Sequence, residues 1–242
     1  MSCKYRNFRF PKDVYDNGMN IYKKGSATIY PGITVLVGCN GSGKTTLMRI
    51  IKEKLTERKI PMIYYNNLSD GGNDSMQEAL MRGNMEFLIE SSLSSEGERI
   101  VLNLRKVIDQ IVYFIKNRTL KKSSSASLME ALRKAHGTND KDELDSDSDE
   151  LWILIDAADS GLSIDNIIDL KFVLNQAIVD NRTGTTFYII VSCNEYEMCD
   201  GEQCFDVQKM KYVSIKSYSK FKKVILDSRK YKDSLYSRWN TL

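Results

Sequence analysis

The feature that most constrains this chain is a glycine-rich segment near its N-terminus, Gly38-Cys39-Asn40-Gly41-Ser42-Gly43-Lys44-Thr45. The segment fits the pattern G-x-x-x-x-G-K-[ST], in which glycines allow a tight turn and let backbone N–H groups approach phosphates. An apolar run at 33–37 predicts a buried strand before it, and the residues from Thr46 onward predict a helix after it. Strand, loop and helix together predict a site for a nucleoside triphosphate.

The residues of this segment have separate expected roles. Lys44 is expected to reach the β- and γ-phosphates, and the Thr45 hydroxyl is expected to hold Mg²⁺. The helix N-terminus adds the positive end of its dipole. The alternative is a glycine turn before an ordinary helix. The predicted phosphate-binding residues are Asn40, Gly41, Ser42, Gly43, Lys44, Thr45 and Thr46.

A second carboxylate follows another apolar run. Residues 151–155 are uninterrupted apolar residues, which predict a strand buried on both faces, and Asp156 comes directly after them. A phosphate loop needs such a carboxylate at the end of a neighbouring strand, where it binds Mg²⁺ directly or through water. Asp156 is therefore predicted as a metal ligand together with Thr45. An aspartate that only caps the next turn is the alternative.

The order of the predicted elements indicates an α/β fold in one domain over residues 1–242. Strands and helices alternate, which favours a mostly parallel sheet with helices on both faces. A long helix at 98–118 carries apolar residues at helical spacing. The other expected strands are 4–10, 26–30, 60–65, 186–191, 204–207 and 212–215, and the other expected helices are one to about residue 58, one at 163–179 and one near the C-terminus.

Composition narrows the class of protein. The 242 residues carry a net charge of only +3, which does not by itself imply a nucleic-acid partner. The five cysteines are odd in number and form no C-x-x-C, so a zinc site or disulfide framework is not expected. No apolar signal segment or membrane-length run occurs in the sequence. We therefore expect a cytoplasmic protein without a membrane partner.

Charge is distributed unevenly along the chain. Residues 121–150 are polar and end in an acidic run at 140–150, which predicts a flexible insertion with solvated charges. The only histidine, His136, lies there and is expected on the surface. Residues 209–242 are predicted to form a basic extension, because the stretch is rich in lysine and arginine. Such a cluster can lie along a nucleic-acid backbone.

Three further segments carry a family resemblance. Ser94-Ser95-Glu96-Gly97-Glu98-Arg99, at the start of the long helix, resembles the signature motif of ABC-type ATPases in the form used by the SMC/RecF branch. Asp159-Ser160-Gly161-Leu162-Ser163 is similar to the D-loop of that family. The segment 66–70 follows the second strand where the family has its Q-loop, but it contains no glutamine. The motif order resembles the family over nearly the whole chain.

The resemblance implies a mechanism built on a homodimer. Two heads would sandwich each ATP between one phosphate loop and the partner's signature motif, and Mg²⁺ would accompany the ATP. Ser95 and the backbone of Gly97 would bind the γ-phosphate in trans, at a second helix N-terminus. ATP would then favour the dimer, and hydrolysis would release it. The residues implied for catalysis are Lys44, Asp156 and Ser95.

Two positions depart from the family pattern. Ala157 stands where family members usually have a glutamate that activates water, and alanine cannot accept a proton. Ser192-Cys193-Asn194 stands where the family has its switch histidine, although Cys193 or Asn194 remains able to contact the γ-phosphate. Slow or impaired hydrolysis is the expected result. A naturally weak ATPase and an introduced substitution at Ala157 both explain the pattern.

Three functions are compatible with these motifs. The first is a stand-alone ATPase acting on DNA or RNA, since the compact size and divergent motifs resemble ATPases of phages and mobile elements. The second is a non-catalytic regulator, in which ATP assembles a dimer that binds a partner protein. The third is a transporter ATPase subunit, which would require a membrane partner.

Overall fold

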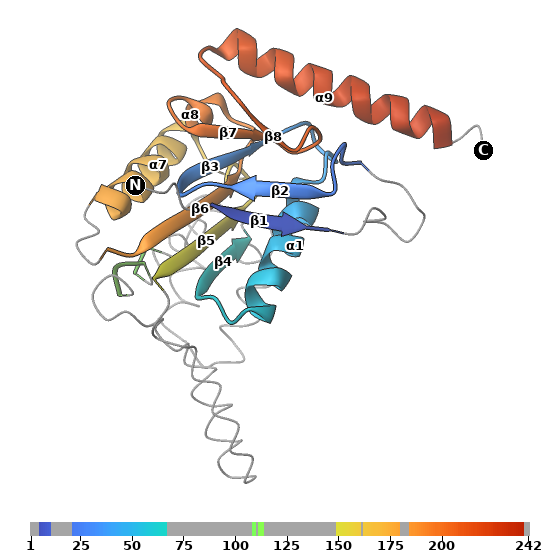
Figure 1. Cartoon of the computed structure of the whole chain (residues 1–242). Coiled ribbons are helices and arrows are strands. Elements are labelled where there is room, and N and C mark those ends of the chain that lie inside the picture. Colours follow the sequence, from blue (N-terminus) through green and yellow to red (C-terminus); the bar gives the residue numbers. More distant parts are fainter. Residues whose placement is uncertain are drawn as a thin grey trace, which may run out of the picture.

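The fold is built around a central six-stranded sheet (Figure 1). The computed structural model describes residues 5–10, 21–66, 108–109, 111–113, 149–160, 162–179 and 184–239. The strands are β1 (Arg6–Arg9), β2 (Ser26–Ile29), β3 (Gly32–Val37), β4 (Met62–Asn66), β5 (Glu150–Asp156), β6 (Thr186–Ser192), β7 (Gln203–Asp206) and β8 (Lys211–Val213), and the helices are α1 (Lys44–Glu57), α7 (Ile164–Val179), α8 (Tyr196–Cys199) and α9 (Tyr218–Trp239).

The strand order of the central sheet is β4-β5-β6-β3-β7-β8. All neighbouring pairs are parallel except the edge pair β7–β8. The expectation that Asp156 ends a strand next to the phosphate-loop strand was wrong, because β6 lies between β5 and β3. Six of the seven residues of β6 are buried, which suits a strand covered on both faces and places it inside the sheet.

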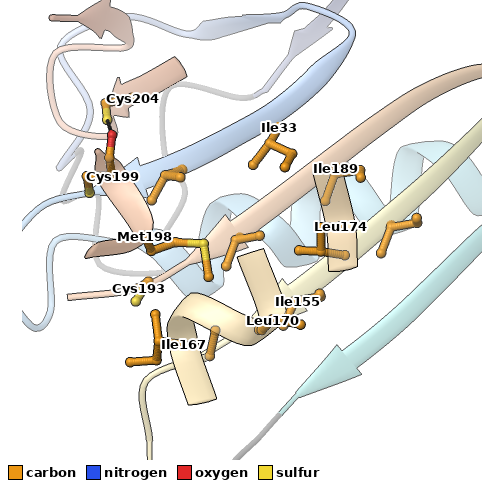
Figure 2. Packing of buried hydrophobic residues seen from close by; sticks show 14 of the residues in the cluster. Ile33, Ile155, Ile167, Leu170, Leu174, Ile189, Cys193, Met198, Cys199 and Cys204 are labelled. Carbon is orange, nitrogen blue, oxygen red and sulfur yellow. Dashed lines mark hydrogen bonds between the residues drawn. The ribbon is translucent and has the colours of Figure 1, made fainter. Parts of the chain in front are cut away.

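Alternate residues of the sheet face two separate apolar cores. On one face, Ile33 and Val35 of β3 pack with Leu170 and Leu174 of α7, as Figure 2 shows for part of this cluster. On the other face, Leu36 packs with α1 and with the small β1–β2 sheet. The predicted mostly parallel sheet with helices on both faces is therefore confirmed.

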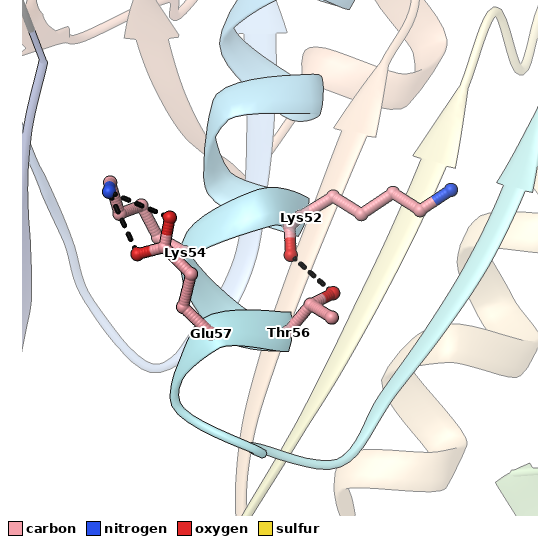
Figure 3. A network of polar contacts seen from close by, with 4 residues as sticks. All are labelled: Lys52, Lys54, Thr56 and Glu57. Atoms are coloured by element: carbon pink, nitrogen blue, oxygen red, sulfur yellow. Dashed lines mark hydrogen bonds and ion pairs between the residues drawn. The ribbon is translucent and has the colours of Figure 1, made fainter.

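Helix α1 connects the phosphate loop to the far end of the sheet. Leu47, Met48, Ile51 and Leu55 are buried at helical spacing, which fixes one face of the helix against the sheet. At the exposed last turn, Lys54 pairs with Glu57 at 2.8 Å (Figure 3). Because its buried face anchors α1, the start of the helix holds a fixed position beside β3.

The predicted elements agree with the described ones to within a few residues at their ends. The sequence did not predict α8, which is a single short turn of helix. In the expected helix at 98–118, residues 108–109 and 111–113 are helical, and Ile111 is buried in the core. The remainder of that helix lies outside the described residues, as do His136 and residues 121–148 of the insertion.

Glu150 corrects the interpretation of the acidic run. Solvated charges were expected throughout 140–150, but Glu150 is the first residue of β5 and is only 6% exposed. It accepts two hydrogen bonds from Arg6, at 2.7 and 3.0 Å. A buried carboxylate requires such a partner. The acidic run therefore ends in a structural ion pair between β1 and β5.

No helix among the described residues is both long and apolar enough to cross a membrane. The longest, α9, carries many charged residues along its 22 positions.

Candidate nucleotide-binding site

The phosphate loop lies between the end of β3 and the start of α1, as its sequence predicts. Gly41 and Gly43 have φ angles of 75° and 93°, in the left-handed region that favours glycine. A Cβ at Gly43 would lie 2.3 Å from Ile21 Cδ1 and 2.8 Å from Tyr22 Oη. Both the backbone conformation and the available space therefore require glycine at position 43.

The N-terminus of α1 offers an anion-binding end. The helix begins at Lys44, and its N-cap residue is Gly43, which has no side chain to cap the first N–H groups. The first turn of α1 contains no acidic residue. The first N–H groups of a helix have no acceptor within the helix and carry the positive end of its dipole. This end of α1 therefore fits the phosphates of a nucleotide.

Lys44 is held across the loop by three oxygen atoms. Its Nζ donates to the carbonyl oxygens of Gly38 at 2.7 Å and Cys39 at 3.3 Å, and to Asn194 Oδ1 at 2.9 Å. Burial lowers the pKa of Lys44, and the nearby carboxylates of Asp159 and Asp156 oppose that shift. A phosphate would supply the negative charge that this partly desolvated ammonium lacks.

Asn194 connects the loops that follow three adjacent strands. Its Oδ1 accepts from Lys44, and its Nδ2 donates to Asp159 Oδ2 at 3.1 Å and Asn40 Oδ1 at 3.3 Å. These partners follow β3 and β5, whereas Asn194 follows β6, which lies between them. Ligands of open α/β sheets bind at such carboxyl ends.

The two sequence candidates after β6 have different environments. Cys193 is completely buried in the apolar core on the α7 face, whereas Asn194 reaches Lys44. Burial raises the pKa of Cys193 to about 12. Of the two, Asn194 is therefore the residue placed to contact a phosphate.

Asp156 lies at the end of β5 and is only 1% exposed. Its Oδ1 accepts hydrogen bonds from Ser192 Oγ and, at 3.1 Å, from the Ala157 N–H. Thr45 is exposed in the first turn of α1. Within the described ranges, no group of three His, Cys, Asp or Glu side chains could hold a metal by itself. One hydroxyl and one carboxylate fit Mg²⁺, which commonly completes its shell with phosphates and water.

A comparison with protein families identifies the class of this site. The sequence matches the family model described as an AAA domain over residues 28–197. The chain belongs to the AAA-domain family. The matched range contains the phosphate loop, β5 with Asp156, and β6 with Asn194 after it. The chain therefore carries an ATP-binding phosphate-loop ATPase domain with an α/β fold.

The other comparisons add little to the AAA assignment. No curated protein matches the sequence. One similar solved structure is a nucleotide-free ATP-binding cassette from an ABC transporter, with 15% identity, a TM-score of 0.43, and coverage of 96% of this chain and 98% of that one. The SMC/RecF resemblance of this AAA domain stays a prediction.

Ala157 adopts a backbone conformation that is uncommon for alanine. Its φ is 53°, and its N–H donates to Ser192 Oγ at 2.8 Å as well as to Asp156. The next N–H, of Ala158, donates to the Ser192 carbonyl at 2.9 Å. The AAA domain therefore holds this turn by hydrogen bonds to the end of β6, and position 157 carries only a methyl group.

The C-terminal helix of the AAA chain also touches the phosphate loop, which the sequence did not predict. Ser228 Oγ accepts a hydrogen bond from the Cys39 N–H at 3.0 Å, and Lys232 Nζ donates to the Asn40 carbonyl at 3.1 Å. Ser228 is only 4% exposed. No local sequence pattern indicates a contact between residues this far apart in the chain.

Several predicted site residues lie outside the described part of this AAA chain. They include Ser95 and Gly97 of the signature-like motif, Gly161 of the D-loop-like segment, and residues 67–70. Asn66, the first residue of the Q-loop-like segment, pairs with Asp156 in the register of β4 and β5. Asn66 therefore lies directly beside Asp156 across the β4–β5 pair.

Proposed function

We propose that this protein is a nucleotide-controlled switch that binds Mg-ATP at the phosphate loop and hydrolyses it slowly. The observation that carries the proposal is the pair of residues at the end of β5, Asp156 and Ala157. Asp156 is buried and hydrogen-bonded to Ser192 at the end of β6, whereas Ala157 offers no group that can accept a proton. The site thus has residues for holding the nucleotide and lacks the usual group for activating water.

The proposed ligand set begins with the loop. The Lys44 side chain and the N–H groups of Gly41, Gly43, Lys44, Thr45 and Thr46 would bind the phosphates. The Ser42 N–H already donates to the Cys39 carbonyl at 3.0 Å, so Ser42 would shape the loop around them. Thr45 and Asp156 would hold Mg²⁺, which neutralises phosphate charge when it is bound. Asn194 would orient Lys44 and offer its amide to the terminal phosphate.

Hydrolysis can be tested by restoring the missing carboxylate. Turnover of unaltered protein, Ala157→Glu and Lys44→Ala is measured with saturating Mg-ATP, and binding is measured by calorimetry. We expect unaltered protein to bind ATP with little turnover, and Ala157→Glu to raise turnover by about 10²-fold, the lower end of general-base effects. Lys44→Ala should lose both ATP binding and turnover. Turnover of unaltered protein near 10 s⁻¹, an ordinary enzyme rate, would contradict impaired hydrolysis.

The proposed assembly is a homodimer closed around two ATP molecules, with Ser95 and Gly97 of each chain reaching the other's nucleotide. The support is the resemblance of residues 94–99 to a signature motif. Analytical ultracentrifugation with saturating Mg-ATP should detect a dimer of the unaltered protein. Ser95→Arg should remain monomeric while it still binds ATP. A dimer of the same strength in Ser95→Arg would overturn this arrangement.

The proposed partner is DNA or RNA, bound through the basic surface of α9. Lys220, Lys222 and Lys223 are exposed, while Phe221 and Val224 bury the opposite face of the helix. Exposed lysines along one helix suit a phosphate backbone.

A salt series tests this partner. Binding to duplex DNA and to single-stranded RNA is measured for unaltered protein and for a variant with glutamine at the three α9 lysines. The control variant carries glutamine at Lys24, Arg49 and Arg58, which are exposed and lie outside α9. Of the two variants, we expect only the α9 variant to lose affinity for nucleic acid. Its remaining affinity should depend less on salt concentration than that of unaltered protein. Equal losses in both variants, or no binding, would favour the second candidate function, an ATP-gated regulator of a partner protein.

A further inference from the structure

We propose that Lys232 of α9 is a further nucleotide-binding residue, which supplies a second ammonium group to the phosphates in the loop. This inference rests on the proposed binding of Mg-ATP. It concerns a helix that lies outside the residues matched by the family model, 28–197.

The first support is the position of the Lys232 side chain. Its Nζ donates to the Asn40 carbonyl at 3.1 Å, in the middle of the phosphate loop. The side chain also passes over Gly41, where an added Cβ would lie 3.6 Å from Lys232 Cδ and 3.8 Å from Nζ. The ammonium group therefore lies at the rim of the loop, beside the residues expected to surround the phosphates.

The second support is the anchoring of α9 beside the loop. Ser228, one helical turn before Lys232, is buried and accepts the Cys39 N–H. Phe221 and Val224 are buried in the core on the preceding turns of the same helix. Figure 1 shows α9 as a continuous helix, so these contacts restrict where the Lys232 side chain can reach. A side chain on a fixed helix loses less freedom on binding than one on a mobile terminus.

The third support is the chemistry of the present acceptor. The Asn40 carbonyl is neutral, and its hydrogen bond to Lys232 is exposed. Such a bond contributes little net energy, whereas an ammonium binds a phosphate oxygen more strongly because both groups are charged. The nearest acidic residue along the helix is Asp233. Its carboxylate lies 4.0 Å from Arg229, so Arg229 is the cation with which it is spaced to pair. Lys232 therefore gains by exchanging the carbonyl for a phosphate oxygen.

The competing explanation is that Lys232 only anchors α9 to the loop. An anchor would affect every nucleotide equally through the shape of the loop, and it would stabilise the protein without nucleotide. A phosphate ligand instead discriminates by the charge of the nucleotide. Affinities for ATP, ADP and AMP therefore separate the two roles.

The experiment uses the full chain with Lys232→Ala, Lys232→Arg and the control Lys230→Ala. Lys230 is exposed on the same helix, so its replacement removes the same charge without the loop contact. Dissociation constants for Mg-ATP, Mg-ADP and AMP are measured by calorimetry at two salt concentrations. Thermal unfolding is measured without nucleotide.

For Lys232→Ala we expect about a tenfold loss of ATP affinity, a smaller loss for ADP and little change for AMP. The loss should shrink as salt rises. Lys232→Arg should retain most of the affinity, and Lys230→Ala should behave like unaltered protein. An equal loss of affinity for all three nucleotides would show that Lys232 only anchors α9, and it would overturn the proposal. A lowered Tm without any difference between the nucleotides would do the same. Failure of the unaltered chain to bind ATP would instead overturn the proposed function itself.

Discussion

The side chain of Asn194 accepts a hydrogen bond from Lys44 and donates one to Asp159, so it joins the phosphate loop to the turn after β5. Its Oδ1 lies 2.9 Å from Lys44 Nζ. We expect Asn194→Asp to weaken ATP binding by more than tenfold. The new carboxylate would pair with Lys44 and repel both the phosphates and Asp159. Calorimetric titration with Mg-ATP measures the change.

Asn194→Ala is the matched control for that substitution. It removes the same hydrogen bonds but adds no charge, so its effect on ATP affinity should be smaller than that of Asn194→Asp. Equal losses would show that the lost amide, rather than the added charge, determines the affinity.

The lowered pKa of Lys44 predicts a dependence of nucleotide affinity on pH. Burial favours the neutral amine in the free protein, and a bound phosphate favours the ammonium. Below the lowered pKa, Lys44 is protonated in both states, and affinity does not vary on its account. Above it, binding must take up a proton, so affinity should fall by up to about tenfold per pH unit.

The measurement uses ADP without Mg²⁺ between pH 7 and pH 10, because magnesium hydroxide forms in alkaline solution. Circular dichroism over the same range confirms that the fold persists. Lys44→Met should bind weakly at every pH and should lack this decline. A decline of the same steepness in Lys44→Met would assign it to another group.

Gly43→Ala should destabilise the protein by about 2–5 kcal/mol, because it combines a left-handed alanine with overpacking. The new methyl would lie 2.3 Å from the buried Ile21 side chain. Urea unfolding gives the free energy. Gly184→Ala is the control: its φ is 72°, but no atom of the described residues lies within 4 Å of the added Cβ. A similar loss in both variants would mean that strain alone determines the effect.

Ala157→Gly should stabilise the protein by up to about 1 kcal/mol, although glycine usually destabilises. The φ of 53° at Ala157 is strained for alanine and relaxed for glycine. The greater entropy of glycine in the unfolded chain opposes part of this gain. Urea unfolding of the two forms measures the difference. A loss of stability would show that the Ala157 methyl makes packing contacts that outweigh its strain.

The sequence was sufficient to predict the glycine loop between a strand and a helix, the position of Asp156 at a strand end, and most strands. These features depend on local patterns, namely glycine spacing and apolar runs. The position of β6 between β3 and β5 could not be predicted in this way, because all three strands are apolar and buried, and their order depends on long-range pairing that no local pattern shows. The buried Glu150 was missed for a related reason, since its partner Arg6 belongs to a distant strand.

The contact between α9 and the phosphate loop has a consequence for how the chain matures. The Cys39–Ser228 and Asn40–Lys232 hydrogen bonds join residues that are 189 and 192 positions apart. During synthesis the loop therefore leaves the ribosome long before its two partners on α9. A nascent chain that has not yet produced α9 contains the whole glycine motif but leaves the Cys39 N–H without Ser228. Synthesis of α9 is thus what completes the hydrogen bonding of the phosphate loop.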